Sequence, residues 1–148
     1  NLENVHSIID EIVFKSVSIK RDVVEADEFD KGERMLLNFG HTLGHSIEQY
    51  YHYTVISHGI AVEKCMEMIT DLAEKRGMCR KGLTADLCGC LKKYELTRDI
   101  EPTPAQLGSA CMNDKKRDGS SIHVIICSDI GKSSAVKMSV ADFNDFLA

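Results

Sequence analysis

Residues 34–48 read RMLLNFGHTLGHSIE, and the rest of the chain is organised around this stretch. At about 100° of turn per residue, a helix over it gathers five polar residues within an arc of roughly 80°. These residues, the polar stripe, are Arg34, Asn38, His41, His45 and Glu48. The opposite face is apolar, as expected of a helix that lies on a core: Leu36, Phe39, Leu43, Ile47 and Tyr50. The stripe suits a ligand, and the alternative is a hydrated helix whose histidines are four residues apart by chance.

Two glycines, Gly40 and Gly44, flank the polar stripe. Each costs a helix about 1 kcal/mol against alanine, so their presence needs a structural reason. Only glycine allows another backbone to approach closely on this side. We therefore expect the helix to be packed on both sides.

A third histidine follows the stripe at His58, in the string SHGIAV of residues 57–62. Ser57 is a predicted N-cap because an apolar run begins directly after it. His58 then lies in the first turn of the next helix and can face back toward His41 and His45. Three imidazoles from two adjacent helices suit zinc or cobalt. A simple zinc protease is not indicated, because Thr42 stands where that motif has glutamate.

The strings NFGHTLGHSIE, residues 38–48, and HGIAV, residues 58–62, together resemble the signature of the C-terminal domain of the 3-dehydroquinate synthase family. This family belongs to the sugar-phosphate cyclases. Upstream, SIKRDVV (18–24) and DEFDKGER (27–34) resemble the family's lysine segment and its acidic loop. Downstream, DKK (114–116) and Ile130-Gly131 resemble its lysine loop and hairpin. The resemblance covers nearly all 148 residues in the same order.

The resemblance implies a mainly α fold, in which several helices and a small β-hairpin form the C-terminal domain. It implies a lyase that converts 3-deoxy-D-arabino-heptulosonate 7-phosphate to 3-dehydroquinate and phosphate, in the shikimate pathway of aromatic amino acid biosynthesis. NAD takes a hydride from a ring hydroxyl and later returns it. A bound Zn²⁺ or Co²⁺ acidifies that hydroxyl, which is the Lewis-acid role of a catalytic metal.

By position, the resemblance implies that His41 and His58 are metal ligands. His45 matches the histidine placed for proton transfer near the phosphate, which is work typical of an imidazole.

The resemblance also assigns substrate contacts to basic and amide side chains. Catalytic contacts with the substrate and its anionic groups fall to Lys20, Arg34 and Asn38. One of Lys115 and Lys116 is implied to reach the substrate phosphate as a flexible point charge.

In the family, the third metal ligand is a glutamate in a segment that would precede Asn1, and the NAD-binding domain lies further upstream. No G-x-G-x-x-G string is present in the 148 residues. We therefore expect NAD to be bound mainly by an N-terminal domain of the same protein. We expect this chain by itself to bind metal weakly and to be inactive, and the full-length protein to be a homodimer.

Composition limits the class of protein. A length of 148 residues suits one domain, residues 1–148, with a modest core. A net charge of −5 with both signs mixed argues against a nucleic-acid partner. No apolar run is long enough to span a membrane and no signal-like segment is found, which favours a cytoplasmic protein. Six cysteines without C-x-x-C spacing favour reduced, packing thiols.

Apolar periodicity and turn residues predict the remaining elements. Residues 1–24 form one long helix or two, and an acidic loop follows to residue 33. Further helices are predicted at 34–48, 57–77, 81–94 and 103–113, with residues 114–119 as a basic loop. Strands at 122–127 and 134–138 form a hairpin, and a helix at 139–147 is capped by Ser139.

Three alternatives stay open from the sequence. The first is another sugar-phosphate cyclase, similar to 2-deoxy-scyllo-inosose synthase. This alternative stays open because the sequence departs from the pattern of the 3-dehydroquinate synthase family. Ile60 stands where the family commonly has a glutamate that closes a capping box, and Glu63 and Lys64 stand where it commonly has small residues. The second is a helical module without catalysis, whose metal site is idle. The third is a metal-dependent polyol dehydrogenase, which the cations Lys20 and Arg34 argue against because its chemistry needs no phosphate contacts.

Overall fold

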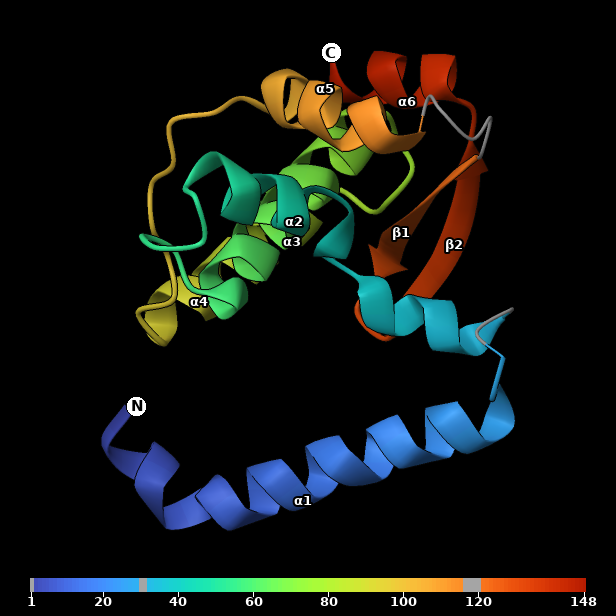
Figure 1. The fold of residues 1–148 in the computed structure, drawn as a ribbon. Helices are drawn as coiled ribbons and strands as arrows, with labels where there is room; N and C mark the ends of the chain where they lie inside the picture. The colour runs from blue at the N-terminus through green and yellow to red at the C-terminus, as the bar shows by residue number, and fades with distance from the viewer. Residues whose placement is uncertain (1, 30–31, 116–120) are drawn as a thin grey trace.

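The computed structural model describes residues 2–29, 32–115 and 121–148 (Figure 1). Its elements are α1 (Leu2–Ala26), the 3₁₀ helix η1 (Glu33–Asn38), α2 (His41–Tyr50), α3 (His58–Lys75), α4 (Leu83–Lys93), α5 (Pro104–Lys115), β1 (Ile122–Asp129), β2 (Lys132–Met138) and α6 (Val140–Leu147). The predicted mainly α fold with one hairpin is confirmed for these residues. No helix in the described ranges is both long and apolar enough to cross a membrane.

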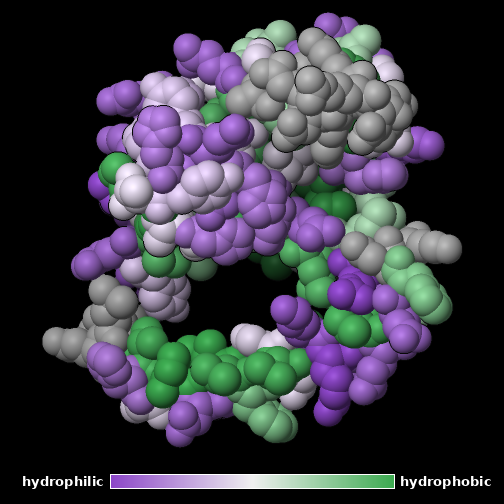
Figure 2. All heavy atoms as spheres, in the orientation of Figure 1, coloured by the Kyte–Doolittle hydropathy of each residue, from purple (hydrophilic) through white to green (hydrophobic). Residues whose placement is uncertain are grey.

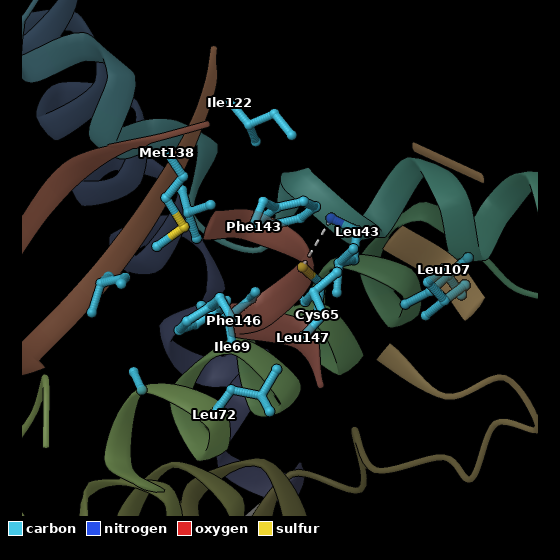
Figure 3. Packing of buried hydrophobic residues seen from close by; sticks show 14 of the residues in the cluster. Leu43, Cys65, Ile69, Leu72, Leu107, Ile122, Met138, Phe143, Phe146 and Leu147 are labelled. Carbon is cyan, nitrogen blue, oxygen red and sulfur yellow. Dashed lines mark hydrogen bonds between the residues drawn. The ribbon is translucent and has the colours of Figure 1, made fainter. Parts of the chain in front are cut away.

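The core lies where α2, α3, α5, α6 and the hairpin meet (Figure 3). Its largest fully buried side chains are Leu43, Ile47, Cys65, Ile69, Leu107, Ile122, Val124 and Phe143. The backbone N–H of Leu43 donates to the Cys65 thiol at 3.3 Å and so joins α2 to α3. Burial raises the pKa of Cys65 to about 12, so this thiol stays protonated and acts as a packing residue.

Local signals in the sequence set several helix ends as predicted. Ser57 is the N-cap of α3, where its hydroxyl accepts from the N–H of Ile60 at 3.5 Å. Gly77 follows the end of α3 in the left-handed conformation, with φ of +68°. Ser139 and Asp142 form a reciprocal capping box at the start of α6. Residues 2–26 form one helix rather than two.

The prediction of one continuous helix over residues 34–48 is wrong. A 3₁₀ turn ends at Asn38, Phe39 is extended with ψ of 127°, and α2 begins only at His41. Gly40 causes the break, because it is left-handed with φ of +81°. Arg34 and Asn38 therefore lie on a different segment from the histidines, and the polar stripe is not continuous. The predicted loop after residue 113 is also too early, because the backbone of Asp114 and Lys115 belongs to α5.

The predicted close backbone approach is confirmed at Gly40. A Cβ at this position would lie 2.6 Å from the Val62 carbonyl oxygen and 2.7 Å from Cγ of Met66. Gly44, one turn later, would place a Cβ at an ordinary 3.6 Å from Val62. The start of α2 is therefore pressed against the backbone of α3, and only a residue without a side chain fits there.

This contact predicts a large cost for Gly40→Ala. The left-handed backbone costs alanine about 1–2 kcal/mol, and the clash with Val62 adds about 1–3 kcal/mol, so the unfolding free energy should fall by about 3 kcal/mol or more. Gly77→Ala is the matched control, because Gly77 is also left-handed but a Cβ there meets nothing within 4 Å. Urea denaturation measures the unfolding free energy of each variant. An equal loss of unfolding free energy in the two variants would show that the α2–α3 contact at Gly40 contributes nothing.

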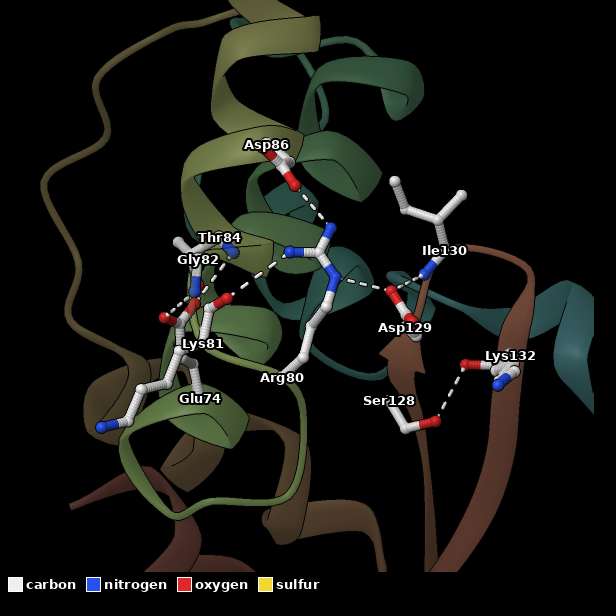
Figure 4. A network of polar contacts seen from close by, with 10 residues as sticks. All are labelled: Glu74, Arg80, Lys81, Gly82, Thr84, Asp86, Ser128, Asp129, Ile130 and Lys132. Carbon is white, nitrogen blue, oxygen red and sulfur yellow. Dashed lines mark hydrogen bonds and ion pairs between the residues drawn. The ribbon is translucent and has the colours of Figure 1, made fainter.

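A polar network holds the start of α4 against α3 and the hairpin (Figure 4). The Glu74 carboxylate accepts from the N–H of Gly82 at 2.6 Å and from that of Thr84 at 2.9 Å. Arg80 pairs with Asp86 and, through Nε at 2.6 Å, with Asp129. The hydrogen bond from Gly82, followed by those from Thr84, lowers the pKa of Glu74 to about 2.

A pH dependence of stability follows from Glu74. Because its folded pKa of about 2 lies below the ordinary 4.5, its hydrogen bonds stabilise the fold above about pH 4.5 and are lost as pH falls toward 2. The difference in unfolding free energy between the wild type and Glu74→Gln should therefore shrink across this range. Exposed Glu95, changed to Gln, serves as a control that should follow the wild type. A difference that stays constant between pH 5 and 2 contradicts this role.

Candidate metal and substrate site

The structure brings the three predicted histidines together. His41 and His45 lie one turn apart on α2, and His58 begins α3. The ring centroid of His58 is 5.2 Å from that of His41 and 6.0 Å from that of His45, and the two rings on α2 are 5.9 Å apart. The prediction that His58 faces back toward α2 is confirmed. We call these three side chains the histidine cluster.

Glu48 bridges two members of the histidine cluster. Its Oε2 lies 2.9 Å from Nδ1 of His45, and its Oε1 lies 3.1 Å from Nδ1 of His58. The Glu48 side chain is 12% exposed, whereas the two rings are more than half exposed, so the carboxylate lies beneath them. The pKa of Glu48 lies below its ordinary value, mainly because of the hydrogen bond from His45. Burial raises this pKa, and the hydrogen bond from His58 lowers it further.

These contacts determine the tautomers of the neutral rings. A carboxylate oxygen can only accept, so Nδ1 of His45 and Nδ1 of His58 must each carry the donated proton. Nδ1 of His41 lies 3.2 Å from the carbonyl oxygen of Phe39, which is also only an acceptor. Each of the three rings is therefore left with a free lone pair on Nε2. A lone pair of this kind can bind a metal ion or take a proton.

The donor chemistry of the cluster fits a divalent transition metal. Imidazole nitrogens and carboxylate oxygens are ligands that zinc and cobalt accept. Within the described ranges, one group has ligating atoms that all lie within 4.8 Å of one another, and it consists of His45, Glu48 and His58. Of the two predicted metal ligands, the group includes His58 but not His41. Glu48 was predicted only as part of the polar stripe, although its spacing of three residues from His45 could have indicated the contact.

The predicted substrate contacts are less closely gathered. Arg34 donates from Nη1 to the Glu28 carbonyl oxygen at 2.8 Å, so it holds the acidic loop rather than the rings. Asn38 is exposed at the end of η1, and Lys20 is exposed on α1. Lys116 lies outside the described residues, as does the side chain of Lys115.

Comparison with known proteins identifies the fold and the family of the chain. The fold resembles a crystal structure of 2-deoxy-scyllo-inosose synthase complexed with carbaglucose-6-phosphate, NAD⁺ and Co²⁺, with a TM-score of 0.70 and 20% identity over 88% of this chain and 38% of that one. At that identity the likeness shows the fold alone. Residues 1–117 match the sequence profile of a family described as 3-dehydroquinate synthase C-terminal.

Curated relatives agree with this family. The 3-dehydroquinate synthase of Clostridium perfringens (strain 13 / Type A) is 42% identical over 144 residues, which cover 97% of this chain and 41% of the relative. The enzyme of the same name from Streptococcus thermophilus (strain ATCC BAA-491 / LMD-9) is 37% identical over 148 residues, which cover 97% of this chain and 42% of the relative. The chain belongs to the 3-dehydroquinate synthase C-terminal family, as its motifs predicted. It spans about two fifths of the length of these relatives.

The bridging role of Glu48 predicts an effect on the imidazole tautomers. In Glu48→Gln, the amide oxygen can accept one Nδ1–H, but the amide nitrogen is a donor and needs an unprotonated nitrogen. One of His45 and His58 should therefore change to the tautomer protonated on Nε2. Nitrogen-15 NMR of the imidazole rings at a pH where they are neutral measures this.

Glu101→Gln is the control for this experiment, because Glu101 contacts Tyr50 and Tyr51 rather than the cluster. Both rings should keep the proton on Nδ1 in the wild type and in Glu101→Gln. Unchanged tautomers in Glu48→Gln would mean that the carboxylate does not set them.

Proposed function

We propose that this chain is the metal-binding part of a cytoplasmic 3-dehydroquinate synthase, which converts 3-deoxy-D-arabino-heptulosonate 7-phosphate to 3-dehydroquinate and phosphate. Membership of the family supports the reaction, together with 37–42% identity to enzymes of that name over nearly the whole chain. The observation that carries the proposal is the histidine cluster. Its three free Nε2 lone pairs provide the metal ligands and the proton acceptor that this reaction needs.

Two donor sets compete for the metal on this chain. One is the group of His45, Glu48 and His58, and the other is the pair His41 and His58. Because Glu48 already accepts from two imidazoles, we assign it the role of holding those rings, as carboxylates do beside many metal sites. His41 and His58 would then hold Zn²⁺ or Co²⁺, with a further ligand from the longer polypeptide. When bound, the ion supplies Lewis acidity to the substrate hydroxyl.

His45 is assigned to proton transfer. Glu48 fixes the proton on Nδ1 of this ring, so Nε2 is the atom that accepts a proton from the substrate. The His45 side chain is 68% exposed in this chain, so a substrate can reach it. Its neighbours would be the metal-holding rings on one side and the substrate phosphate on the other.

The cationic and amide side chains are assigned to the substrate's anionic groups. Lys20, Arg34 and Asn38 would contact its carboxylate and hydroxyls, and Lys115 or Lys116 its phosphate. The Arg34 guanidinium already donates to the Glu28 carbonyl oxygen, so its position is fixed before a substrate binds. NAD would be bound mainly by the rest of a full-length protein, which we expect to be a homodimer.

A chimera tests this function. In it, residues 1–148 replace the matching part of the Clostridium perfringens relative, and phosphate release from 3-deoxy-D-arabino-heptulosonate 7-phosphate is measured with NAD and Zn²⁺ supplied. We expect turnover by the chimera and none by the 148-residue chain alone. His58→Ala should lower kcat about 100-fold or more, because both a ligand and a ring held by Glu48 are lost.

His123→Ala is the control, because this exposed histidine on β1 contacts α2 through its backbone carbonyl oxygen, which accepts from Thr42 and is kept in the variant, so kcat should not change. Clear turnover by the 148-residue chain alone would overturn the expected need for the longer polypeptide. A folded chimera that binds Co²⁺ but releases no phosphate would contradict the proposed reaction. Turnover only with a hexose 6-phosphate would favour the other cyclase.

A further inference from the structure

Glu63, on α3, is a buried carboxylate without a hydrogen-bond partner. The residue is 5% exposed, and within the described ranges neither of its carboxylate oxygens accepts a hydrogen bond. The outer surface of the helices above α1 is mostly hydrophilic on the side that Figure 2 shows, where charged side chains contact water. Glu63 is an exception, because an ionised carboxylate that is buried and unpaired is strongly destabilising.

The helical period places Glu63 on the side of α3 that meets α4. At about 100° per residue, Glu63, Glu67 and Glu74 fall within an arc of about 40°. Glu74 accepts from two backbone N–H groups at the start of α4, and the Cys88 thiol of α4 hydrogen-bonds to Glu67. Burial raises the pKa of Cys88 most, and the negative charges of Glu67 and Glu63 add to this effect. Glu63 therefore lies at the contact between α3 and α4.

Two charged side chains on α3 act on Glu63 with opposite signs. Lys64 donates to Glu67 at 2.5 Å, so its positive charge is already paired with another carboxylate. Burial has the largest effect and raises the pKa of Glu63 above the ordinary 4.5, while Lys64 lowers it and Glu67 raises it. The charged residues on α4 and on the segment that follows it are exposed to solvent: Asp86, Lys92, Lys93, Glu95, Arg98, Asp99 and Glu101.

α4 is held firmly at its start and weakly toward its end. Of its residues, only Leu83 is fully buried, whereas Leu87 and Leu91 are half-buried. None of the described side chains that form the core belongs to α4. An apolar pocket of about 280 Å³, lined in part by Thr70, Leu83 and Leu87, leaves the packing of α4 on α3 incomplete. Figure 1 shows α4 at the edge of the molecule, so its second half can move away from α3 without disturbing the core.

We propose that Glu63 is a pH-sensitive latch between α3 and α4. As the neutral acid, Glu63 stays buried and α4 lies closed against α3. When it gives its proton to water as the pH rises, the carboxylate must be hydrated. The second half of α4, residues 87–93, then separates from α3 and admits water. The latch therefore closes at low pH and opens at high pH.

The sign of the effect on stability follows from the raised pKa of Glu63. Below about pH 4.5, Glu63 is protonated in both the folded and the unfolded chain. Above this pH the unfolded chain loses the proton first, so stability falls until Glu63 ionises in the folded chain and is constant from there on. Glu74 acts in the opposite direction and below pH 4.5, so the two carboxylates affect stability in separate ranges of pH.

Glu63→Gln tests the latch, because its side chain has the same shape and cannot ionise. The unfolding equilibrium constant of the wild type should rise relative to that of Glu63→Gln by up to about tenfold for each pH unit above 4.5, until Glu63 ionises. Urea denaturation from about pH 4 to about pH 8 measures this ratio. Glu25→Gln is the matched control, because Glu25 is exposed on α1, and it should follow the wild type throughout.

Hydrogen exchange shows whether α4 is the part that opens. After correction for the intrinsic effect of pH, the amides of residues 87–93 should be about tenfold less protected in the wild type than in Glu63→Gln at about pH 8. The two proteins should be equally protected at about pH 4, where Glu63 is neutral. Equal protection at both pH values would overturn the proposed movement of α4.

Carbon-13 NMR of the Glu63 carboxyl group tests the latch in the wild type, so the test does not depend on whether the variant folds. We expect this carboxyl to titrate with a midpoint above 4.5 and the amide signals of residues 87–93 to shift with the same midpoint. A midpoint at or below 4.5 would overturn the proposal. None of these measurements requires metal, substrate or turnover, so their outcome is separate from that of the proposed function.

Discussion

The direct contact between Gly40 and the backbone of α3 is the constraint on which the site depends. The Val62 carbonyl oxygen occupies the space next to the missing side chain of Gly40. This brings the first turn of α2 against the start of α3, so that His41 and His45 meet His58 at ring separations of 5.2–6.0 Å. The same left-handed glycine also ends the preceding 3₁₀ turn. One residue therefore sets both the closeness of the two helices and the direction from which Arg34 and Asn38 approach.

Beyond this contact, α2 has two faces with different tasks. Leu43 and Ile47 are fully buried in the core and fix the rotation of the helix. That rotation directs His45 and Glu48 away from the core, where Glu48 holds two imidazoles from two helices. The packing of apolar side chains is thus what positions the polar ones. A carboxylate that lies beneath the rings also keeps their Nε2 lone pairs available.

Much of this arrangement could be predicted from the sequence, because it follows from local rules. The 3.6-residue period predicted α3, α4 and the buried face of α2. Ser57 and Gly77 marked the two ends of α3. The break at Gly40 could not be predicted, because glycine fits both a helix and a left-handed turn, and the choice depends on Val62, 22 residues away. The two contacts of Glu48 likewise depend on how α2 packs on α3. The apolar period of residues 1–24 predicted a helix, and most of its large apolar side chains are exposed in this chain.

X-ray absorption of the chimera loaded with Co²⁺ can identify which histidines hold the metal, because it counts the imidazoles bound to the ion. We expect scattering from two imidazoles in the wild type and from one in either His41→Ala or His58→Ala, with His45→Ala unchanged. A spectrum that loses an imidazole in His45→Ala but not in His41→Ala would contradict the assignment. It would show that the ion is held by His45, Glu48 and His58 instead.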